Sequence, residues 1–319
     1  MKQLITKSVF IITLCCGFCP LPIRGQNKIE KTMNYSKVNY HYCKVEDVEL
    51  FYRTAGDRTK PAMLLLHGFP SSSHMFRDLI PELADDFYVI APDYPGFGQT
   101  EAPGRDKFDY TFEHLTDIVD AFTQKLKLKR FALYVFDYGA PIGFRLAMRH
   151  PEQITAIISQ NGNVYREGLG KKWAAREAYW RNPTPELRKE FSSAFVPETI
   201  KGQYLGGTAD RAVSPDGYTL DIAYVSQPGR AEIQSDLILD YRTNVALYPM
   251  FQTYLREYQP PLLAVWGKND PSFIPQGAEA FKRDVPNAEI HWVDSGHFAL
   301  ETHAKEIGQM IVAFMKKLP

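Results

Sequence analysis

The chain has 319 residues, of which 45% are hydrophobic and 23% are charged, and its formal net charge at pH 7 is 0. This length suits one large α/β domain with an insertion or two small domains, in a protein of ordinary globular composition. The balanced charge and the lack of a basic stripe, arm or motif exclude a protein that binds nucleic acid through an electropositive surface.

Residues 1–25 have the pattern of a secretory signal peptide. Two lysines precede an apolar run over residues 9–14, which is too short for a transmembrane helix, and the small residue Gly25 follows. We therefore expect cleavage near Gly25 and export, to a periplasm or to the outside. Nothing after residue 26 is long and apolar enough to span a bilayer. The mature chain would keep only Cys43 and form no internal disulfide.

From residue 37 onward, the pattern predicts a β-hairpin followed by alternating strands and helices. Two amphipathic helices stand out by their i, i+3, i+4, i+7 spacing, one between Leu115 and Leu126 and one between Ile307 and Phe314. The hairpin is predicted over residues 37–45 and 48–55, and the later strands over residues 63–66, 87–90, 131–136, 154–158, 262–266 and 289–293. Near-continuous apolar strands that alternate with helices favour a mostly parallel α/β sheet with both faces covered.

Residues 162–245 interrupt this alternation. They hold few Val or Ile runs, many aromatic residues, several prolines and helical-looking pieces such as residues 172–180. We interpret them as a helical cap inserted between two strands of a core domain, which comprises residues 37–161 and 246–319.

A single acid, Asp137, stands between the apolar run 131–136 and a helix that Pro141 opens. The small residues Gly139 and Ala140 follow it, which predicts a sharp strand-to-helix turn that presents the Asp137 side chain. An isolated Asp after a strand is commonly a helix cap, but most proteins with this turn carry a serine nucleophile there. A carboxylate at that point changes the chemistry that the turn can perform.

Two further polar residues follow predicted strands. Asp270 comes after residues 262–266, and His297 comes after residues 289–293. Ligands of open α/β sheets bind at the carboxyl ends of the strands, and the chain order nucleophile, acid, histidine is that of α/β-hydrolases. Asp294 is an alternative orienting acid, although its place is more typical of a turn residue.

These motifs together resemble the epoxide hydrolase and haloalkane dehalogenase branch of the α/β-hydrolases, over roughly residues 40–318. The resemblance implies a mostly parallel sheet covered by helices on both faces, with an inserted helical cap. Its carriers are His67-Gly-Phe-Pro70, Pro92-Asp-Tyr-Pro-Gly-Phe-Gly98, Val135-Phe-Asp-Tyr-Gly139, Trp266-Gly-Lys-Asn-Asp270 and Asp294-Ser-Gly-His297.

The resemblance assigns a role to each matching residue. Asp137 would be the nucleophile, His297 the general base and Asp270 its orienting acid, while the backbone N–H groups of Phe69 and Tyr138 would form the oxyanion hole. A carboxylate can attack an sp3 carbon and form an alkyl ester, which a water activated by histidine then hydrolyses. This chemistry needs no cofactor and no metal, and activity should fall below about pH 6.5 as the histidine becomes protonated.

Epoxide opening also needs a proton donor for the leaving oxygen, a role that two cap tyrosines usually fill in epoxide hydrolases. Tyr241 lies in Leu239-Asp-Tyr-Arg-Thr-Asn244, which resembles the segment that carries the second of them. For the first, we expect Tyr179, with Tyr165 and Tyr204 as rivals. The resulting hypothesis is hydrolysis of a small apolar epoxide to a diol.

Dehalogenation of haloalkanes or haloacids is the alternative. Haloalkane dehalogenases commonly hold halide with a Trp directly after the nucleophile, where this chain has Tyr138, although Trp173 or Trp180 could donate from the cap. Fluoroacetate-type relatives usually carry Arg at that position, which is also absent. A Ser-independent esterase or lyase and a catalytically idle member that only binds a ligand are further alternatives, and neither substrate nor oligomeric state is indicated.

Overall fold

The computed structural model describes residues 37–209 and 211–318. The predicted signal peptide over residues 1–25 and its cleavage near Gly25 therefore lie outside the described residues. No helix in the described part of the chain is long and apolar enough to cross a bilayer.

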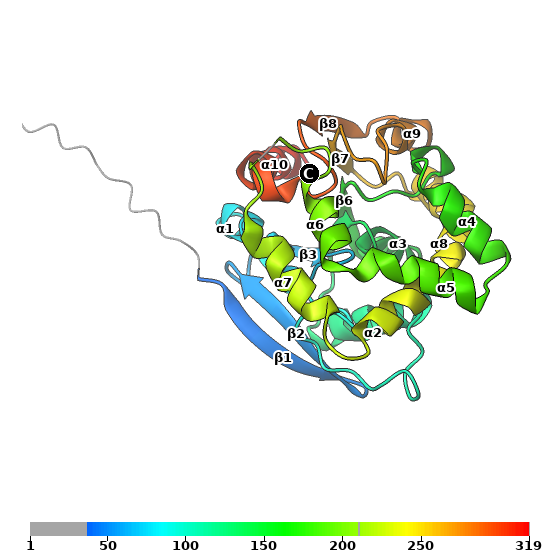
Figure 1. Cartoon of the computed structure of the whole chain (residues 1–319). Helices are drawn as coiled ribbons and strands as arrows, with labels where there is room; N and C mark the ends of the chain where they lie inside the picture. Colours follow the sequence, from blue (N-terminus) through cyan, green and yellow to red (C-terminus); the bar gives the residue numbers. More distant parts are fainter. Residues whose placement is uncertain (1–36, 210, 319) are drawn as a thin grey trace, which may run out of the picture. The chain divides into compact units, whose positions relative to one another are not determined.

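An eight-stranded sheet forms the centre of the fold (Figure 1). Its spatial order is β1-β2-β4-β3-β5-β6-β7-β8. The β1–β2 and β2–β4 pairs are antiparallel and all the other pairs are parallel. The strands are β1 (Asn39–Val45), β2 (Val48–Ala55), β3 (Ala62–Leu66), β4 (Tyr88–Pro92), β5 (Phe131–Phe136), β6 (Ile154–Gln160), β7 (Leu262–Gly267) and β8 (Glu289–Val293). The predicted hairpin, the later strands and the mostly parallel α/β architecture are confirmed.

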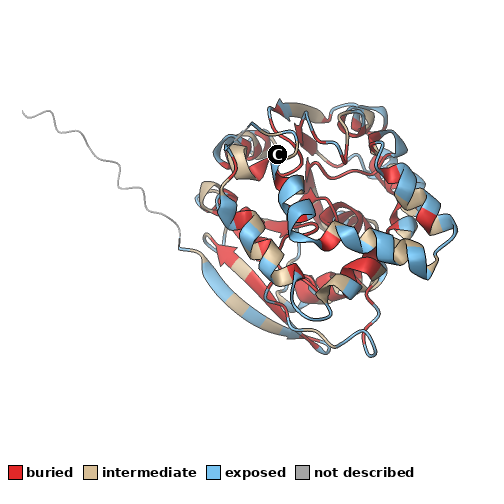
Figure 2. Ribbon diagram, in the orientation of Figure 1, coloured by how far each residue is buried: buried red, intermediate tan, exposed pale blue. Residues whose placement is uncertain are grey.

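Successive residues of the central strands face two separate hydrophobic cores. In β3, Met63 and Leu65 face one core while Leu64 and Leu66 face the other. Because both faces are covered, every residue of such a strand is apolar, which explains the uninterrupted hydrophobic runs. Figure 2 shows the same pattern as buried strands inside a layer of half-exposed helices.

Helices cover both faces of the sheet. Residues of α1 (Leu79–Leu83) and α10 (Leu300–Met315) line one core, and residues of α2 (Phe112–Lys125), α3 (Gly139–Arg149) and α9 (Gln276–Asp284) line the other. Thr111 caps α2, since its hydroxyl accepts the backbone N–H of His114 at 3.2 Å. Both helices predicted from apolar spacing are confirmed, as α2 and α10. Four short 3₁₀ turns complete the set: η1 (Ser73–Phe76), η2 (Pro151–Gln153), η3 (Arg166–Gly168) and η4 (Ser192–Phe195).

The segment between β6 and β7 is helical. It contains α4 (Trp173–Arg181), α5 (Pro185–Phe191), α6 (Pro197–Leu205), α7 (Pro215–Val225) and α8 (Arg230–Tyr258). A proline opens each of α5, α6 and α7, where its missing N–H costs no hydrogen bond. The expected cap boundary after residue 245 falls inside α8, which continues to Tyr258 and ends at Gln259 in the left-handed conformation (φ 45°). The long helix therefore links the cap directly to β7.

Candidate active site

The turn after β5 holds Asp137 in a conformation that few side chains tolerate. Its φ is 45°, in the left-handed region. A Cβ atom on Gly139 would lie 2.1 Å from the carbonyl oxygen of Leu66, and one on Gly68 would lie 2.3 Å from the Cβ atom of Asp137. Only glycine fits at these two positions, so β3, β5 and the start of α3 meet closely around the carboxylate.

One backbone amide already binds this carboxylate. The N–H of Phe69, in the loop after β3, donates to Oδ1 of Asp137 at 2.8 Å. Tyr138, predicted as the second amide donor, is the N-cap residue of α3, and the described residues include no hydrogen bond from its N–H to Asp137. The second oxygen, Oδ2, faces His297 instead.

His297 lies between the two predicted acids. Its Nε2 atom is 3.5 Å from Oδ2 of Asp137, and its Nδ1 atom is 2.6 Å from Oδ2 of Asp270. All three side chains are buried, with His297 only 4% exposed. The structure therefore brings together the nucleophile, base and acid that the sequence places at three different strand ends.

Asp270 is held by hydrogen bonds on both oxygens. The backbone N–H of Ser272 donates to Oδ1 at 2.6 Å, and Nδ2 of Asn161 donates to Oδ2 at 2.8 Å. Asn161 follows β6 with a φ of 47°, and its Oδ1 accepts the N–H of Gly267 at 2.9 Å, which ties the ends of β6 and β7 together. Asn161 is not among the residues that the sequence assigns to the site. The sequence feature that could have identified Asn161 is its position directly after a strand, because Asn is a short polar residue that tolerates the left-handed region.

The charges around His297 set its protonation. Burial by itself lowers the pKa of His297, but the Asp270 and Asp137 carboxylates outweigh it and raise the pKa to about 9. The resting imidazole is therefore protonated at neutral pH and lies between two carboxylates. The alternative acid, Asp294, is exposed and pairs with Lys268 at 3.1 Å and with Asn269 at 3.1 Å.

Two tyrosines of α8 are close enough to the nucleophile for the charge of Asp137 to act on them. The hydroxyl oxygens of Tyr241 and Tyr248 are 3.5 Å apart, and Nδ2 of Asn163 donates to the Tyr248 hydroxyl at 3.4 Å. The Tyr241 ring lies 5.7 Å from that of Tyr138. Burial raises the pKa of Tyr241 and that of Tyr248, and the Asp137 carboxylate raises both further. Both hydroxyls therefore keep their protons at neutral pH.

Tyr248 was not among the predicted donors. It follows Tyr241 by seven residues, which places both on one face of a helix, but the sequence does not mark the 29-residue helix that carries them. Tyr179 is buried with its ring 5.1 Å from that of Phe191, and no recorded contact joins it to Asp137.

The hydroxyls of both rival tyrosines are engaged elsewhere. That of Tyr165 donates to Asp284 at 2.8 Å, and that of Tyr204 donates to Asp221.

The two cap tryptophans have their indole N–H groups bound to the protein. Nε1 of Trp173 donates to the carbonyl oxygen of Ser272 at 3.0 Å, and Nε1 of Trp180 donates to that of Ile238 at 2.8 Å. Neither N–H is free to hold a halide. Their rings pack on Tyr241 at 4.7 and 6.0 Å and so support its position.

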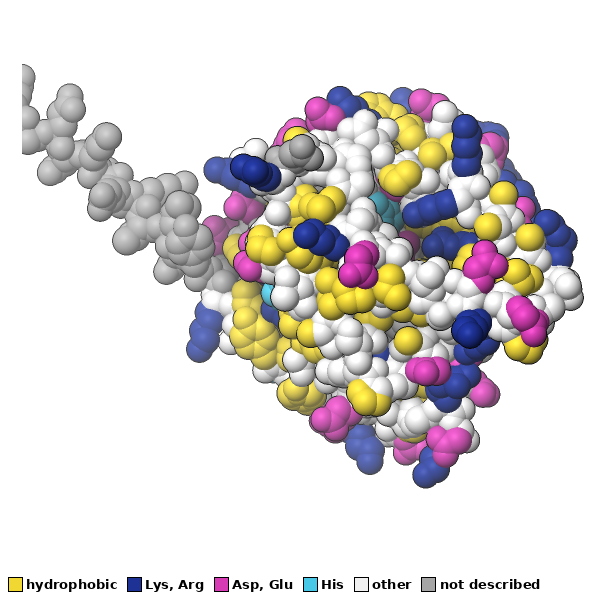
Figure 3. Space-filling view, in the orientation of Figure 1, with side chains coloured by type: hydrophobic (Ala, Val, Ile, Leu, Met, Phe, Trp, Pro, Cys, Tyr) yellow, Lys and Arg dark blue, Asp and Glu magenta, His cyan; other side chains and the backbone are white. Residues whose placement is uncertain are grey.

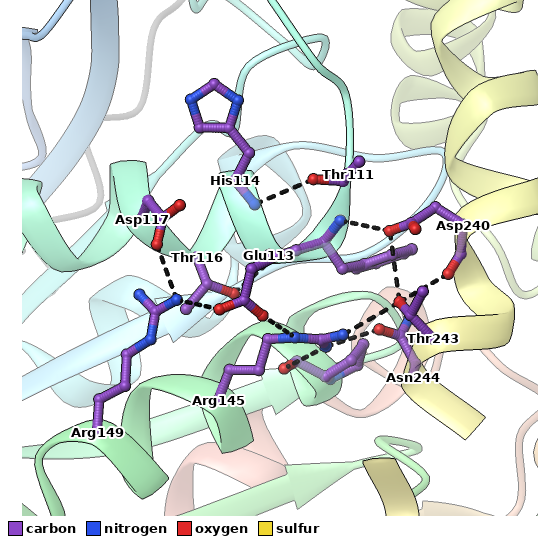
Figure 4. Close-up of polar contacts among 12 residues, drawn as sticks. Thr111, Glu113, His114, Thr116, Asp117, Arg145, Arg149, Asp240, Thr243 and Asn244 are labelled. Carbon is purple, nitrogen blue, oxygen red and sulfur yellow. Dashed lines mark hydrogen bonds and ion pairs between the residues drawn. The ribbon is translucent and has the colours of Figure 1, made fainter. Parts of the chain in front are cut away.

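A buried arginine fixes α8 over the core (Figure 4). Arg145 of α3 is 3% exposed, and its Nη1 donates to Oδ1 of Asn244 at 2.6 Å while its Nε donates to Glu113 of α2 at 3.0 Å. On the same side, Asp240 accepts the N–H of Phe112 at 2.8 Å. Because Tyr241 lies between Asp240 and Asn244 in the chain, this network fixes the helical turn that carries the Tyr241 ring.

No group of three or more His, Cys, Asp or Glu side chains within residues 37–209 and 211–318 is arranged to hold a metal ion. The expectation that the reaction needs no metal or cofactor remains a prediction.

Comparison with known proteins gives a family and several relatives. The model of the alpha/beta hydrolase fold family matches residues 61–304. An uncharacterized hydrolase of Saccharomyces cerevisiae is 44% identical over 280 residues, which are 86% of this chain and 96% of that protein. A haloalkane dehalogenase of Psychrobacter cryohalolentis is 35% identical over 297 residues, covering 88% of this chain and 93% of that one.

Solved structures agree on the fold. The haloalkane dehalogenase DbeA of Bradyrhizobium elkani matches with a TM-score of 0.73 and 22% identity over 88% of this chain and all of that one. A suspected epoxide hydrolase of Pseudomonas aeruginosa matches with a TM-score of 0.72 and 19% identity over 88% of this chain and 96% of that one. At these identities, the likeness concerns the fold alone.

Proposed function

Because the chain belongs to the α/β-hydrolase fold family and carries a carboxylate at the nucleophile turn, we propose that it hydrolyses epoxides to diols through an alkyl ester on Asp137. The observation that carries the proposal is the arrangement of three kinds of group around one carboxylate. Asp137 has an amide donor on Oδ1, an imidazole on the side of Oδ2, and a pair of tyrosine hydroxyls on α8 whose pKa values its charge raises.

In the first step, Oδ2 of Asp137 attacks an epoxide carbon, and the bond from that carbon to the ring oxygen breaks. Oδ2 is the attacking atom because the Phe69 amide occupies Oδ1. The departing oxygen takes a proton from the hydroxyl of Tyr241 or Tyr248, and the tyrosine later regains a proton from solvent. The product is a hydroxyalkyl ester of Asp137.

Alkylation removes the charge of Asp137 and lets His297 release its proton to solvent. In the second step, the neutral His297 takes a proton from a water molecule, whose oxygen attacks the ester carbonyl carbon of Asp137. Negative charge then develops on Oδ1, where the Phe69 N–H is already in place. The bond between the carbonyl carbon and Oδ2 breaks, and the leaving alkoxide that contains Oδ2 takes the remaining proton of the added water. The diol leaves with Oδ2, the carboxylate returns with one oxygen from water, and His297 keeps its proton as in the resting enzyme. Asp270 stabilises the imidazolium that forms during this step.

Dehalogenation is the second candidate, favoured by the 35% identical relative named a haloalkane dehalogenase. The same attack by Asp137 would then expel a halide. A halide needs N–H donors, and the indole groups of Trp173 and Trp180 donate to backbone carbonyls instead. A pair of protonated tyrosines suits an alkoxide better, which is why we favour epoxides.

A substrate panel scored for both diol and halide tests this proposal. We expect wild-type protein to release diol from at least one epoxide, and Asp137→Asn protein to release none. His297→Gln protein should accumulate a covalent adduct on Asp137, visible by mass spectrometry of the intact chain. Halide without diol would favour dehalogenation, and no adduct with any epoxide or haloalkane would favour an idle, ligand-binding member of the family.

The N-terminal sequence supports a separate proposal, which is export of the chain after cleavage near Gly25. N-terminal sequencing of the mature protein from its native host tests this. A chain that retains residues 1–25 would contradict it.

A further inference from the structure

Two cations at the start of α4 have no counterpart in the proposed reaction. Lys172 is the N-cap residue of α4, and Arg176 follows it by four residues, so both lie on one face of the helix. A cation is unfavourable at a helix N-terminus, and like charges four residues apart repel each other. Helix stability therefore does not explain this pair.

Both cations lie on the active-site side of the cap. The guanidinium carbon of Arg176 lies 4.4 Å from the ring centre of Trp173, whose ring in turn packs on Tyr241. The charge of Arg176 acts on Tyr138, the residue after the nucleophile, and the charge of Lys172 interacts with both Asp137 and Asp270. Figure 3 shows a hollow in this face of the molecule, with a histidine side chain at its floor and Lys or Arg side chains at its rim near α4.

Neither cation has an ion-pair partner in the part of the chain that the structure describes. Other arginines of the cap and its surroundings form salt bridges, such as Arg188 with Asp236 at 2.6 Å and Arg256 with Asp284 at 2.7 Å. Within residues 37–209 and 211–318, Lys172 and Arg176 make no salt bridge and no hydrogen bond through their side chains. Partial desolvation and the charge of Arg176 lower the pKa of Lys172 to about 8, and the carboxylates of Asp270 and Asp137 oppose this change.

The balance of charge in the site favours an anion. At neutral pH, the two carboxylates of Asp137 and Asp270 face three cations, namely protonated His297, Lys172 and Arg176. One positive charge is therefore left over in the free enzyme. A substrate with one negative charge would compensate the excess in the free enzyme, whereas a doubly charged group such as a phosphate monoester would exceed it.

We propose that Lys172 and Arg176 bind a carboxylate of the substrate, so that the natural substrate is an epoxide that also carries an acid group. This inference rests on the proposed epoxide hydrolysis and narrows its substrate class. The fork of N–H donors on Arg176 suits a carboxylate, and its stacking on Trp173 fixes the plane of that fork. The acid group would lie toward the opening of the hollow, with the epoxide ring held below it between Asp137 and the two tyrosines.

The test compares a charged with an uncharged epoxide of the same shape. The pair is 3-phenylglycidate and 3-phenylglycidol, and the quantity is the ratio of their kcat/KM values. Loss of one charge-assisted contact should lower this ratio about tenfold or more in Lys172→Met and in Arg176→Met protein. Lys171→Met is the matched control, because Lys171 is the neighbouring lysine and precedes α4, outside the helix face that carries Lys172 and Arg176, and its ratio should stay at the wild-type value.

A binding measurement separates this inference from the proposed function. Isothermal titration of the full chain with 3-phenylpropionate and 3-phenylpropanol, neither of which has an epoxide, should show tighter binding of the acid. The Lys172 and Arg176 variants should lose this preference. Epoxide opening with no preference for the acid in either assay would overturn the anion site and leave the proposed function standing. Selective binding of the acid without opening of either epoxide would overturn the proposed function and support the anion site.

Discussion

The Nδ1 atom of His297 lies 2.6 Å from Oδ2 of Asp270, and both side chains are buried. On its other side, the same imidazole meets Asp137 at 3.5 Å. Burial disfavours the charged imidazole, but the two carboxylates prevail and raise the pKa of His297 to about 9. A general base must be neutral to take a proton from water. In the proposed mechanism, alkylation removes the negative charge of Asp137, which is one of the two causes of the raised pKa of His297. The pKa of His297 then falls, and the imidazole becomes neutral.

The first prediction concerns this coupling between Asp137 and His297. Replacing Asp137 by Asn removes the negative charge that alkylation also removes, so the pKa of His297 should fall from about 9. Asp270 should still hold this pKa above the value that burial alone would give. NMR titration of the imidazole resonances measures this pKa. The alkylation step should depend little on pH between 6 and 8, whereas hydrolysis of the ester should slow as the pH falls below the lowered pKa. An unchanged pKa in Asp137→Asn protein would contradict this account.

The second prediction concerns the paired hydroxyls on α8. In His297→Gln protein, which accumulates the ester, adding Tyr241→Phe or Tyr248→Phe should slow alkylation by an epoxide about 10²-fold or more, because the leaving oxygen loses a proton donor. Single-turnover formation of the adduct, followed by mass spectrometry, measures the rate. Tyr254→Phe is the matched control, since Tyr254 is buried on the same helix and its hydroxyl has no partner among the described residues. Equal effects of all three substitutions would contradict a specific role.

The third prediction concerns the packing that forms the nucleophile turn. Gly139→Ala would place a Cβ atom 2.1 Å from the backbone oxygen of Leu66, and the shift this forces should lower the free energy of unfolding by about 1–3 kcal/mol and impair turnover. Gly202→Ala is the control, because Gly202 is an exposed position of α6 with open space around it. That change should raise the free energy of unfolding by up to about 1 kcal/mol. Urea unfolding measures both, and a neutral Gly139→Ala would contradict the close contact.

The fourth prediction concerns a buried acid where the cap meets the loop after β3. Asp221 of α7 accepts the Tyr204 hydroxyl, and burial raises its pKa to about 7 although the Tyr204 and Ser71 hydroxyls oppose this. Between about pH 4 and pH 7, Asp221 is therefore protonated in the folded protein and ionised in the unfolded chain. Because the folded state binds the extra proton, the contribution of Asp221 to the free energy of unfolding falls as the pH rises through this range. Asp221→Asn should therefore gain stability relative to wild type across that range.

Urea unfolding at several pH values measures the Asp221→Asn effect. Asp294→Asn is the contrasting variant: the Lys268 and Asn269 side chains lower the pKa of this exposed acid, so its contribution to stability is complete above about pH 4 and its difference from wild type should stay constant from pH 4 to pH 7. A difference between Asp221→Asn and wild type that stays constant from pH 4 to pH 7 would contradict the raised pKa of Asp221.

The sequence predicts much of the fold because its strands are short apolar runs between amphipathic helices. It also places Asp137, Asp270 and His297 at strand ends, and parallel strands bring such ends to one edge of a sheet. Tyr248 escaped prediction because its role depends on how a cap helix lies over the core, which the buried Arg145–Asn244 contact determines. Contacts of that kind join residues about a hundred positions apart and leave no local pattern.

The cations of α4 escaped prediction for a different reason. A lysine or arginine on a helix is usually solvated, and only the three-dimensional packing of α4 near Asp137 distinguishes Lys172 and Arg176 from the many others. The same limit applies to Trp173 and Trp180. Their type suggests halide donors, and only the structure gives the carbonyl oxygens that already accept their N–H groups.

In the ester mechanism, an oxygen of Asp137 leaves with the product and is replaced by an oxygen from water. A single turnover in H₂¹⁸O, with enzyme in excess over epoxide, tests this most directly. The peptide containing Asp137 should gain one ¹⁸O, and the first diol formed should contain none. A first diol that carries ¹⁸O, released from protein whose Asp137 peptide stays unlabelled, would mean that water attacks the epoxide directly and would contradict the ester mechanism.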